Sequence, residues 1–327
     1  MKELDKSTIA NCKKSIDKVR NEIAKVVVGQ ENVVNGLLRA LLANGHVLVE
    51  GIPGIAKTLL VKTLAHSVNC KFSRIQFTPD LLPTDIVGLT SYDSKKGFYV
   101  VKGPIFSNFV LADEINRAPP KVQSALLESM QEKQVTIGKQ TFHLDNPFLV
   151  LATQNSIETL GAYSLPEAQI DRFLFKLLMT YPSREDEKKI IENNISIKAF
   201  EEYEIKRVMS PNEIIRLQGI TKKISHTDKI KDYIVNIVNS TRNPKKYNIK
   251  TGGFIELGAS PRASINLFIA AKADALLKGD AYITPQHVKD VAFDVLRHRI
   301  ILNYIGQAEG ANTEEVVSEI LSKVPIP

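Results

Sequence analysis

Hydrophobic and polar positions alternate with a helical period near the start of the chain. Apolar residues recur at this spacing over residues 9–23 and again over residues 33–41. The second stretch ends at Asn44 and Gly45, residue types that commonly close a helix. We therefore predict two amphipathic helices before the first strand.

Five short apolar runs follow, and each is typical of a buried parallel strand. They cover residues 46–50, 72–77, 109–112, 148–152 and 173–178. Helical patterns lie between the runs, which favours an α/β architecture with a parallel sheet. Residues 92–99 and 135–142 break the alternation, because a polar turn separates two strand-like runs in each, with Gly138 at the second turn. We predict these two segments to be hairpins.

The pattern changes after Tyr181 and Pro182. Strand-like runs become scarce, and a helix-capping residue followed by proline recurs at residues 210–211, 260–261 and 284–285. We therefore predict a boundary near residue 182. It separates an α/β domain over residues 1–182, which includes the N-terminal helix, from a smaller all-helical domain over residues 183–327.

Composition narrows the class of protein. A chain of 327 residues can bury two domain cores, and 43% hydrophobic with 24% charged residues excludes wholesale disorder or a fibrous repeat. Two distant cysteines, Cys12 and Cys70, make neither a disulfide framework nor a cysteine zinc site, which favours the cytoplasm. No apolar run approaches the ~18 residues of a membrane span, so no integral membrane segment is expected.

The net charge of +7 is compatible with nucleic-acid binding. However, the lysines and arginines are interleaved with acidic residues, and no basic block stands out. Nucleic acid is therefore the less favoured partner.

The strongest chemical signal is the segment GIPGIAKT at residues 51–58, between a predicted strand and a predicted helix. In this context backbone N–H groups and the helix N-terminus bind phosphate. Lys57 would reach the β- and γ-phosphates of a nucleotide, and Thr58 would ligate Mg²⁺. The alternative is a glycine-proline turn with a chance lysine, which the order of strand, loop and helix disfavours.

One position departs from the usual phosphate-loop pattern, because Ala56 stands where glycine precedes the lysine. We expect Ala56 to fit by beginning the helix. The complete expected phosphate-binding set is Gly51, Ile52, Pro53, Gly54, Ile55, Ala56, Lys57, Thr58 and Leu59.

The apolar run over residues 109–112 ends in two acids, Asp113 and Glu114. After a phosphate loop, such a pair fits a Walker B element. Asp113 would hold the Mg²⁺ ion, and Glu114 would orient or deprotonate the attacking water. On its own the acid pair would be typical of a solvated strand end.

Three longer segments resemble the MoxR family of AAA+ ATPases. They are LADEINRAPPKVQSALLE at residues 111–128, LPEAQIDRF at residues 165–173 and GASPRA at residues 258–263. The phosphate loop with Ala56 also resembles that of the family, and the resemblance covers about residues 6–305. It implies the helix-2-insert branch, related to the ATPase subunits of magnesium chelatase. The implied fold is a AAA+ P-loop NTPase core with a parallel sheet and two hairpin insertions, followed by an all-helical lid.

The resemblance also assigns roles that spacing alone does not show. Gly29 and Gln30 match the segment that contacts adenine. Asn155 matches the sensor 1 residue, which holds the water or the γ-phosphate. Arg172 matches an arginine finger that acts in the neighbouring subunit. Arg262 matches sensor 2, which would couple the nucleotide to the lid, either within its own subunit or across the interface.

Each of these assignments has a plainer alternative. Asn155 could be a strand-end cap. Arg172 could form a surface ion pair with Asp171 or Glu167, and Arg262 could be a surface arginine in the first turn of a helix. The histidines look structural, and His298, between Arg297 and Arg299, is predicted to lie on a solvated helix face.

The function that the resemblance implies is ATP hydrolysis with Mg²⁺ by a homo-oligomeric ring, expected to be a hexamer. ATP would bind between the two domains and against a neighbour. The ring would remodel or mature a protein client in a chaperone-like way, for example a protein with a von Willebrand A domain. The hairpins would project toward a central pore, unless they are ordinary surface hairpins.

Two rival functions stay open. One is a nucleic-acid-associated AAA+ motor or clamp-loader-like protein, for which Lys95, Lys96 and Lys139 at the hairpin tips are the hints. The other is a non-enzymatic, nucleotide-gated scaffold, which the presence of Glu114, Asn155 and Arg172 disfavours.

Overall fold

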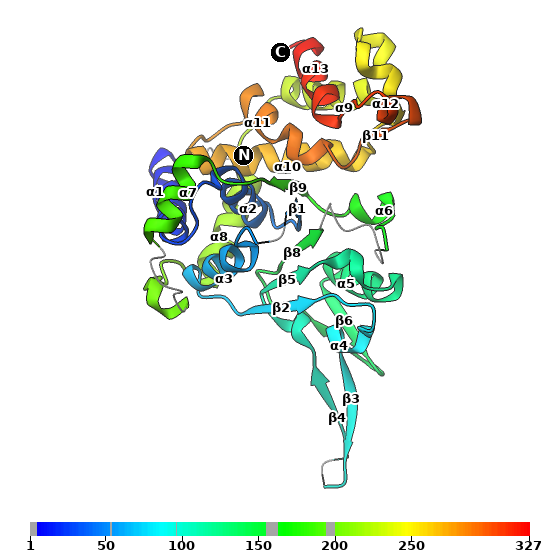
Figure 1. Cartoon of the computed structure of the whole chain (residues 1–327). Coiled ribbons are helices and arrows are strands. Elements are labelled where there is room, and N and C mark those ends of the chain that lie inside the picture. Colours follow the sequence, from blue (N-terminus) through cyan, green and yellow to red (C-terminus); the bar gives the residue numbers. More distant parts are fainter. Residues whose placement is uncertain (1–4, 53, 96, 155–162, 194–199) are drawn as a thin grey trace.

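A five-stranded parallel sheet forms the centre of the first half of the chain (Figure 1). The computed structural model describes residues 5–327 apart from residues 53, 96, 155–162 and 194–199. The strands, in the order in which they pair, are β2 (Phe72–Gln76), β5 (Phe109–Asp113), β8 (Leu149–Gln154), β1 (Val47–Gly51) and β9 (Phe175–Met179). All five correspond to the predicted apolar runs, with ends that differ by at most two residues.

Helices cover both faces of this sheet. One face packs against α1 (Lys6–Ala24), α2 (Glu31–Ala43) and α3 (Lys57–Ser67), and the other packs against α4 (Pro83–Val87) and α5 (Pro120–Glu132). Neighbouring strand residues divide between the faces: Leu48 packs with the α4–α5 side, whereas Val47 and Val49 pack with the α1–α3 side. Burial on both faces explains why the strands are continuous apolar runs rather than alternating ones.

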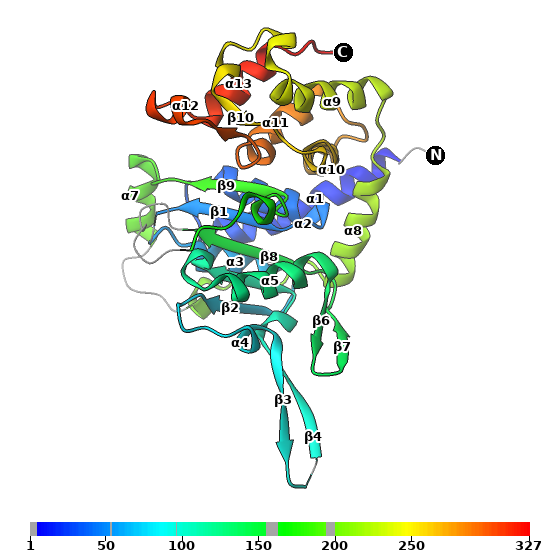
Figure 2. The same cartoon turned by 90° about the vertical axis from the view of Figure 1, so that its right-hand side faces the viewer.

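Both predicted hairpins are present. The first is β3 (Gly88–Asp93) paired with β4 (Gly97–Lys102), and the second is β6 (Gln134–Ile137) paired with β7 (Gln140–His143). Gly138 lies at the tip of the second hairpin with φ of +61°. Figure 2 shows that the β3–β4 hairpin projects away from the sheet on the side opposite the C-terminal helices.

The second half of the chain is mainly helical. Its helices are α7 (Arg184–Asn193), α8 (Pro211–Lys223), α9 (Asp228–Arg242), α10 (Pro261–Lys278), α11 (Pro285–Leu296), α12 (Tyr304–Ala308) and α13 (Thr313–Lys323). The sequence did not reveal a short antiparallel pair, β10 (Ile255–Leu257) with β11 (Ile301–Leu302). The helices from α9 onward lie at the top of Figure 1, and among them α11 contacts β9.

Short helical turns complete the described chain. They are α6 (Glu167–Ile170), η1 (Pro104–Phe106), η2 (Ile115–Arg117), η3 (Phe200–Tyr203), η4 (Pro244–Tyr247) and η5 (Lys250–Phe254). None of the helices in the described part of the chain combines the length and the apolar character that crossing a membrane requires.

Helix ends follow the capping residues that the sequence shows. The side chains of Ser210, Ser260 and Thr284 accept backbone N–H groups at the starts of α8, α10 and α11. Asn44 closes α2 in the left-handed conformation, with φ of +55°. The structure thus confirms these predicted helix ends. Local sequence was enough to predict them, because the groups that cap a helix lie within a few residues of its end.

The predicted boundary near residue 182 lies between β9 and α7. Beyond it, α8 returns to the first domain, where Gln218 Nε2 donates to the Leu41 carbonyl oxygen over 2.8 Å. Helix α10 contacts α1 and α2. The boundary stays a prediction, and the helical part of the chain makes extensive contact with the sheet domain.

Candidate active site

The predicted phosphate loop joins β1 to α3 at the carboxyl edge of the sheet, the edge at which the five parallel strands end. Gly54 has φ of +81°, and Ala56 also lies in the left-handed region, with φ of 59° and ψ of 27°. Helix α3 begins at Lys57, so Ala56 precedes the helix, and the expectation that it begins the helix is wrong. Glycine suits this position because a left-handed alanine costs roughly 1–2 kcal/mol. Pro53 lies outside the described residues.

A cavity of about 440 Å³ opens at the carboxyl edge. Its lining residues are Gly54, Ile55, Ala56, Lys57, Thr58, Leu59, Arg74, Asp113, Glu114 and Thr153. The fold thus brings the predicted phosphate loop and the predicted acid pair together, because the ends of parallel strands meet at one edge. Arg74 and Thr153 are additions that the sequence reasoning missed.

Asp113 is held from two sides. Its Oδ1 accepts from Thr153 Oγ1 over 2.7 Å. Its Oδ2 accepts from Arg74 Nε over 3.1 Å and from Arg74 Nη2 over 2.6 Å. Arg74 lies on β2, directly beside β5. The one signal for it in the sequence is polarity, since Arg74 and Gln76 alternate with the buried Ile75 along a strand of a mostly apolar sheet.

Glu114 adopts a left-handed backbone, with φ of 56°. Its N–H donates to Thr153 Oγ1 over 2.8 Å. Its Oε2 accepts from Gln76 Nε2 over 2.7 Å and from Arg117 Nη1 over 3.0 Å. The backbone conformation costs free energy and is kept because these contacts fix both ends of the residue. They aim a restrained carboxylate at the cavity.

Lys57 folds back onto its own loop, where Nζ donates to the Gly51 carbonyl oxygen over 2.6 Å. Partial burial lowers the pKa of Lys57, and Asp113, Glu114 and Glu50 oppose that shift. Thr58 also lines the cavity. Hydroxyl and carboxylate oxygens are the donors that Mg²⁺ prefers. The carboxyl edge can therefore bind a polyphosphate together with a magnesium ion.

A second cavity, of about 290 Å³, contains the residues predicted to contact adenine. Gly29 and Gln30 line it together with Leu178, Thr180 and Asp186. Gln30 Nε2 donates to the Thr180 carbonyl oxygen over 2.9 Å. Gly29 has φ of +75°, and a Cβ added there would lie 2.7 Å from Asp186 Oδ2, so glycine is required. Asp186 belongs to α7, so both predicted domains border this cavity.

Arg172 lies at the opposite, amino edge of the sheet, where the strands begin. It is exposed and precedes β9, whose five residues span roughly 17 Å at about 3.3 Å per residue. A cavity of about 140 Å³ there is lined by His46, Met130, Gln131, Arg172 and Arg262. Arg262 Nη1 lies 3.1 Å from Asp171 Oδ2. Both predicted arginines therefore lie at one edge, away from the phosphate loop of their own chain.

Asn155 lies outside the described residues. Gln154, the residue before it in the sequence, is the last residue of β8 and lies at the carboxyl edge of the sheet.

The predicted solvated face around His298 is wrong. The side chains of Arg297 and Arg299 are 10% and 1% exposed. His298 Nε2 donates to the Phe173 carbonyl oxygen over 3.3 Å, and burial lowers the pKa of His298 well below its ordinary value. These residues follow α11 and turn back onto the open side of β9, where backbone carbonyl groups need donors.

Two family models match the chain. The model for the ATPase family associated with various cellular activities (AAA) matches residues 46–175, and the model for the AAA lid domain matches residues 251–320. Together with the parallel sheet and the phosphate loop, they define a AAA+ ATPase with its lid.

Relatives narrow the class further. The chain is 47% identical to Chaperone MoxR1 of Mycobacterium tuberculosis over 308 residues, which are 94% of this chain and 81% of that protein. It is 27% identical to Protein MoxR of Methylorubrum extorquens over 321 residues, 94% of this chain and 93% of the relative. The chain belongs to the MoxR family of AAA+ ATPases.

A solved structure agrees with the fold. The crystal structure of a protein from Cytophaga hutchinsonii, named as a candidate ATPase, superposes with a TM-score of 0.91 at 47% identity. The match covers 98% of this chain and 97% of that one.

Proposed function

We propose that this chain hydrolyses ATP with Mg²⁺ in a ring of identical subunits, and that the cycle remodels or matures a protein client. One observation carries the proposal: the phosphate loop and the acid pair lie at the carboxyl edge of the sheet, and two arginines lie at its amino edge. A head-to-tail contact would bring these edges together between neighbours, and repetition of that contact closes a ring. A hexamer is the expected size.

The carboxyl edge supplies the groups that bind and cleave. Lys57 and the N–H groups of its loop bind the phosphates. Thr58 and Asp113 would hold Mg²⁺, which neutralises phosphate charge when bound. Glu114 takes a proton from the attacking water or orients it. Asn155, by its resemblance to sensor 1, would hold the water or the γ-phosphate.

The amino edge supplies positively charged side chains to the nucleotide site of the next subunit. A guanidinium is planar, permanently charged and rich in donors, so it suits the charge that develops on a transferring phosphoryl group. Arg172 is exposed at this edge, as a finger acting on a neighbour must be. Arg262 lies at the same edge on the first turn of α10. We therefore assign Arg262 to the neighbour's nucleotide rather than its own.

The β3–β4 hairpin is the proposed contact with the client. Its tip exposes Tyr92 by 65% and Phe98 by 79%, with ring centroids 5.1 Å apart. Exposed apolar side chains on a projecting element favour a protein partner, such as one carrying a von Willebrand A domain. Nucleic acid that stimulates phosphate release would overturn this assignment in favour of a nucleic-acid motor. Lys96 of the rival interpretation lies outside the described residues.

A mixing experiment tests the ring. Lys57→Ala removes the positive charge that would bind the phosphates, and it should abolish measurable ATP binding. Arg172→Ala should assemble and bind ATP but hydrolyse it about 10³-fold more slowly. An equimolar mixture should recover part of the activity, because an intact loop on one subunit can meet an intact Arg172 on the next.

Steady-state phosphate release measures that recovery, and light scattering verifies assembly. Mixed rings that release no more phosphate than the two separate variants together would show that Arg172 does not act across an interface.

A further inference from the structure

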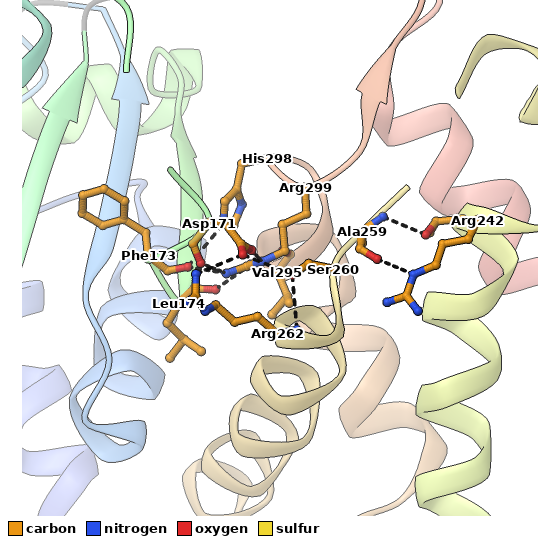
Figure 3. A network of polar contacts seen from close by, with 11 residues as sticks. Asp171, Phe173, Leu174, Arg242, Ala259, Ser260, Arg262, Val295, His298 and Arg299 are labelled. Carbon is orange, nitrogen blue, oxygen red and sulfur yellow. Dashed lines mark hydrogen bonds and ion pairs between the residues drawn. The ribbon is translucent and has the colours of Figure 1, made fainter. Parts of the chain in front are cut away.

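Asp171, the residue before Arg172, connects the sheet domain to the lid (Figure 3). Its Oδ1 accepts from Arg299 Nε over 2.7 Å. Its Oδ2 accepts from Arg262 Nη1 and from Ser260 Oγ, each over 3.1 Å. These three donors come from two separate lid segments, the start of α10 and the residues after α11. One carboxylate therefore joins both segments to the loop that carries the finger.

Arg299 also holds the backbone on both sides of Arg172. Its Nη2 donates to the Asp171 carbonyl oxygen over 3.0 Å and to the Phe173 carbonyl oxygen over 2.5 Å. The guanidinium is almost fully buried, and burial lowers its pKa to about 10, so it stays charged at neutral pH. A buried charge is tolerated when its donors are satisfied, and here backbone and carboxylate oxygens satisfy them. The Arg172 side chain stays exposed while its backbone is held.

The other lid segment is fixed in turn to α9. Arg242 Nε donates to the Ala259 carbonyl oxygen over 2.7 Å, and the Ala259 N–H donates to Thr241 Oγ1 over 2.9 Å. Ser260 and Arg262 follow directly. A shift of the lid helices would therefore be transmitted through this segment to Asp171.

We propose that Asp171 and Arg299 are positioning residues that couple the lid of one subunit to its Arg172, so that the lid controls hydrolysis at the neighbour's nucleotide. The proposal rests on the assignment of Arg172 as a finger acting in the next subunit. A displacement of about 1 Å at such a group can reduce the rate about 10²-fold. A rigid connection on both sides of the finger would transmit a lid movement of that size.

The test uses full-length Arg299→Met and Asp171→Asn proteins. Each should bind a fluorescent ATP analogue as the parent does, because the phosphate loop is untouched, yet release phosphate about 10²-fold more slowly. Mixing Arg299→Met with Lys57→Ala should restore activity, since the second protein supplies a well-placed finger. Mixing Arg299→Met with Arg172→Ala should restore nothing, because neither supplies one.

The second mixture separates positioning from a structural role. If Arg299 supported only its own nucleotide site, its intact finger would rescue Arg172→Ala, and the proposal would be overturned. If Arg299→Met failed to fold, it would not complement Lys57→Ala, and Asp171→Asn would then decide the question by the same two mixtures.

Arg297→Met is the matched control. Arg297 is a largely buried lid arginine that pairs with Asp294 and Glu314 and bonds the Lys176 carbonyl oxygen, and no hydrogen bond or ion pair joins it to Asp171. Its loss should lower thermal stability and leave Arg172→Ala rescuable. Full activity of Arg172→Ala alone would refute the proposed function. Full activity of both Asp171→Asn and Arg299→Met beside an impaired Arg172→Ala would refute only the coupling.

Discussion

The two edges of the central sheet are built in different ways. At the carboxyl edge, one continuous segment at residues 54–59 supplies most of the lining of the cavity, and Arg74, Asp113, Glu114 and Thr153 supply the rest. At the amino edge, the loop that carries Arg172 is held through Asp171 by residues from distant parts of the chain, Ser260, Arg262 and Arg299. A site for the chain's own nucleotide can thus be contained in a short motif. The surface around Arg172 depends instead on how the lid packs against the sheet.

The two edges should differ most in how one conservative substitution changes the rate of ATP hydrolysis. Glu114→Gln should retain ATP binding and lose about 10²- to 10⁴-fold in hydrolysis, because an amide cannot accept the proton. The amide oxygen can still accept from Gln76 and Arg117, so the shape of the cavity persists. Glu167→Gln, the same change on the exposed start of α6 at the amino edge, is the control and should leave the rate unchanged.

Calorimetry and steady-state phosphate release separate binding from turnover in these two variants. Wild-type turnover by Glu114→Gln would remove Glu114 from the catalytic role.

A smaller effect would sharpen the description of the carboxyl edge. Arg74 competes with a cation for Asp113, so Arg74→Gln should lower the Mg²⁺ concentration that half-saturates nucleotide binding by about fivefold, as loss of about 1 kcal/mol of screened repulsion implies. Titration of Mg²⁺ with a fluorescent ATP analogue measures this shift. Arg117→Gln is the control: it also removes one guanidinium charge, but from an arginine that bonds Glu114 and not Asp113. It should therefore shift the Mg²⁺ midpoint less. A higher midpoint in Arg74→Gln would mean that Arg74 assists the metal.

The smallest effect concerns backbone strain in the phosphate loop. Ala56→Gly should remove the backbone strain of a left-handed alanine. The greater conformational freedom of glycine in the unfolded chain should offset part of this gain in stability. The net gain should be at most about 1 kcal/mol, seen as a melting temperature higher by about 1–3 °C without nucleotide.

Gly54→Ala is the control, because it introduces at residue 54 the kind of backbone strain that Ala56→Gly removes. Its φ is also positive, and an added Cβ would meet nothing within 4 Å, so backbone strain alone should lower the melting temperature. A drop in Ala56→Gly would show that the alanine is not strained.

Much of the fold is predictable from particular sequence patterns. The five strands and two hairpins follow from runs of apolar and turn residues, because burial and turn conformation act over a few positions. The helix starts at Ser260 and Thr284 follow for the same reason. The β10–β11 pair was missed because its two- and three-residue strands lie far apart in sequence and carry too short a pattern.

The residues of the candidate site also divide into those that the sequence predicted and those that it missed. Lys57, Thr58, Asp113 and Glu114 share one cavity, as their motifs predict. Arg74 and Gln76 were missed because nothing local distinguishes a polar strand residue that faces solvent from one that holds a carboxylate. The burial of Arg299 and the partial burial of Arg297 and His298 were missed because three consecutive polar residues after a helix ordinarily face water.

The sequence by itself determined the family, the order of elements and the phosphate loop, since each depends on residues close together in the chain. Only the tertiary structure decided that Ala56 is left-handed, that Arg172 and Arg262 lie at the edge opposite the loop, and that Asp171 joins the Arg172 loop to the lid. These facts depend on which distant backbone carbonyls and carboxylates lie within hydrogen-bond distance. That proximity is set by the packing of α10 and α11 beside the sheet, which no local pattern encodes.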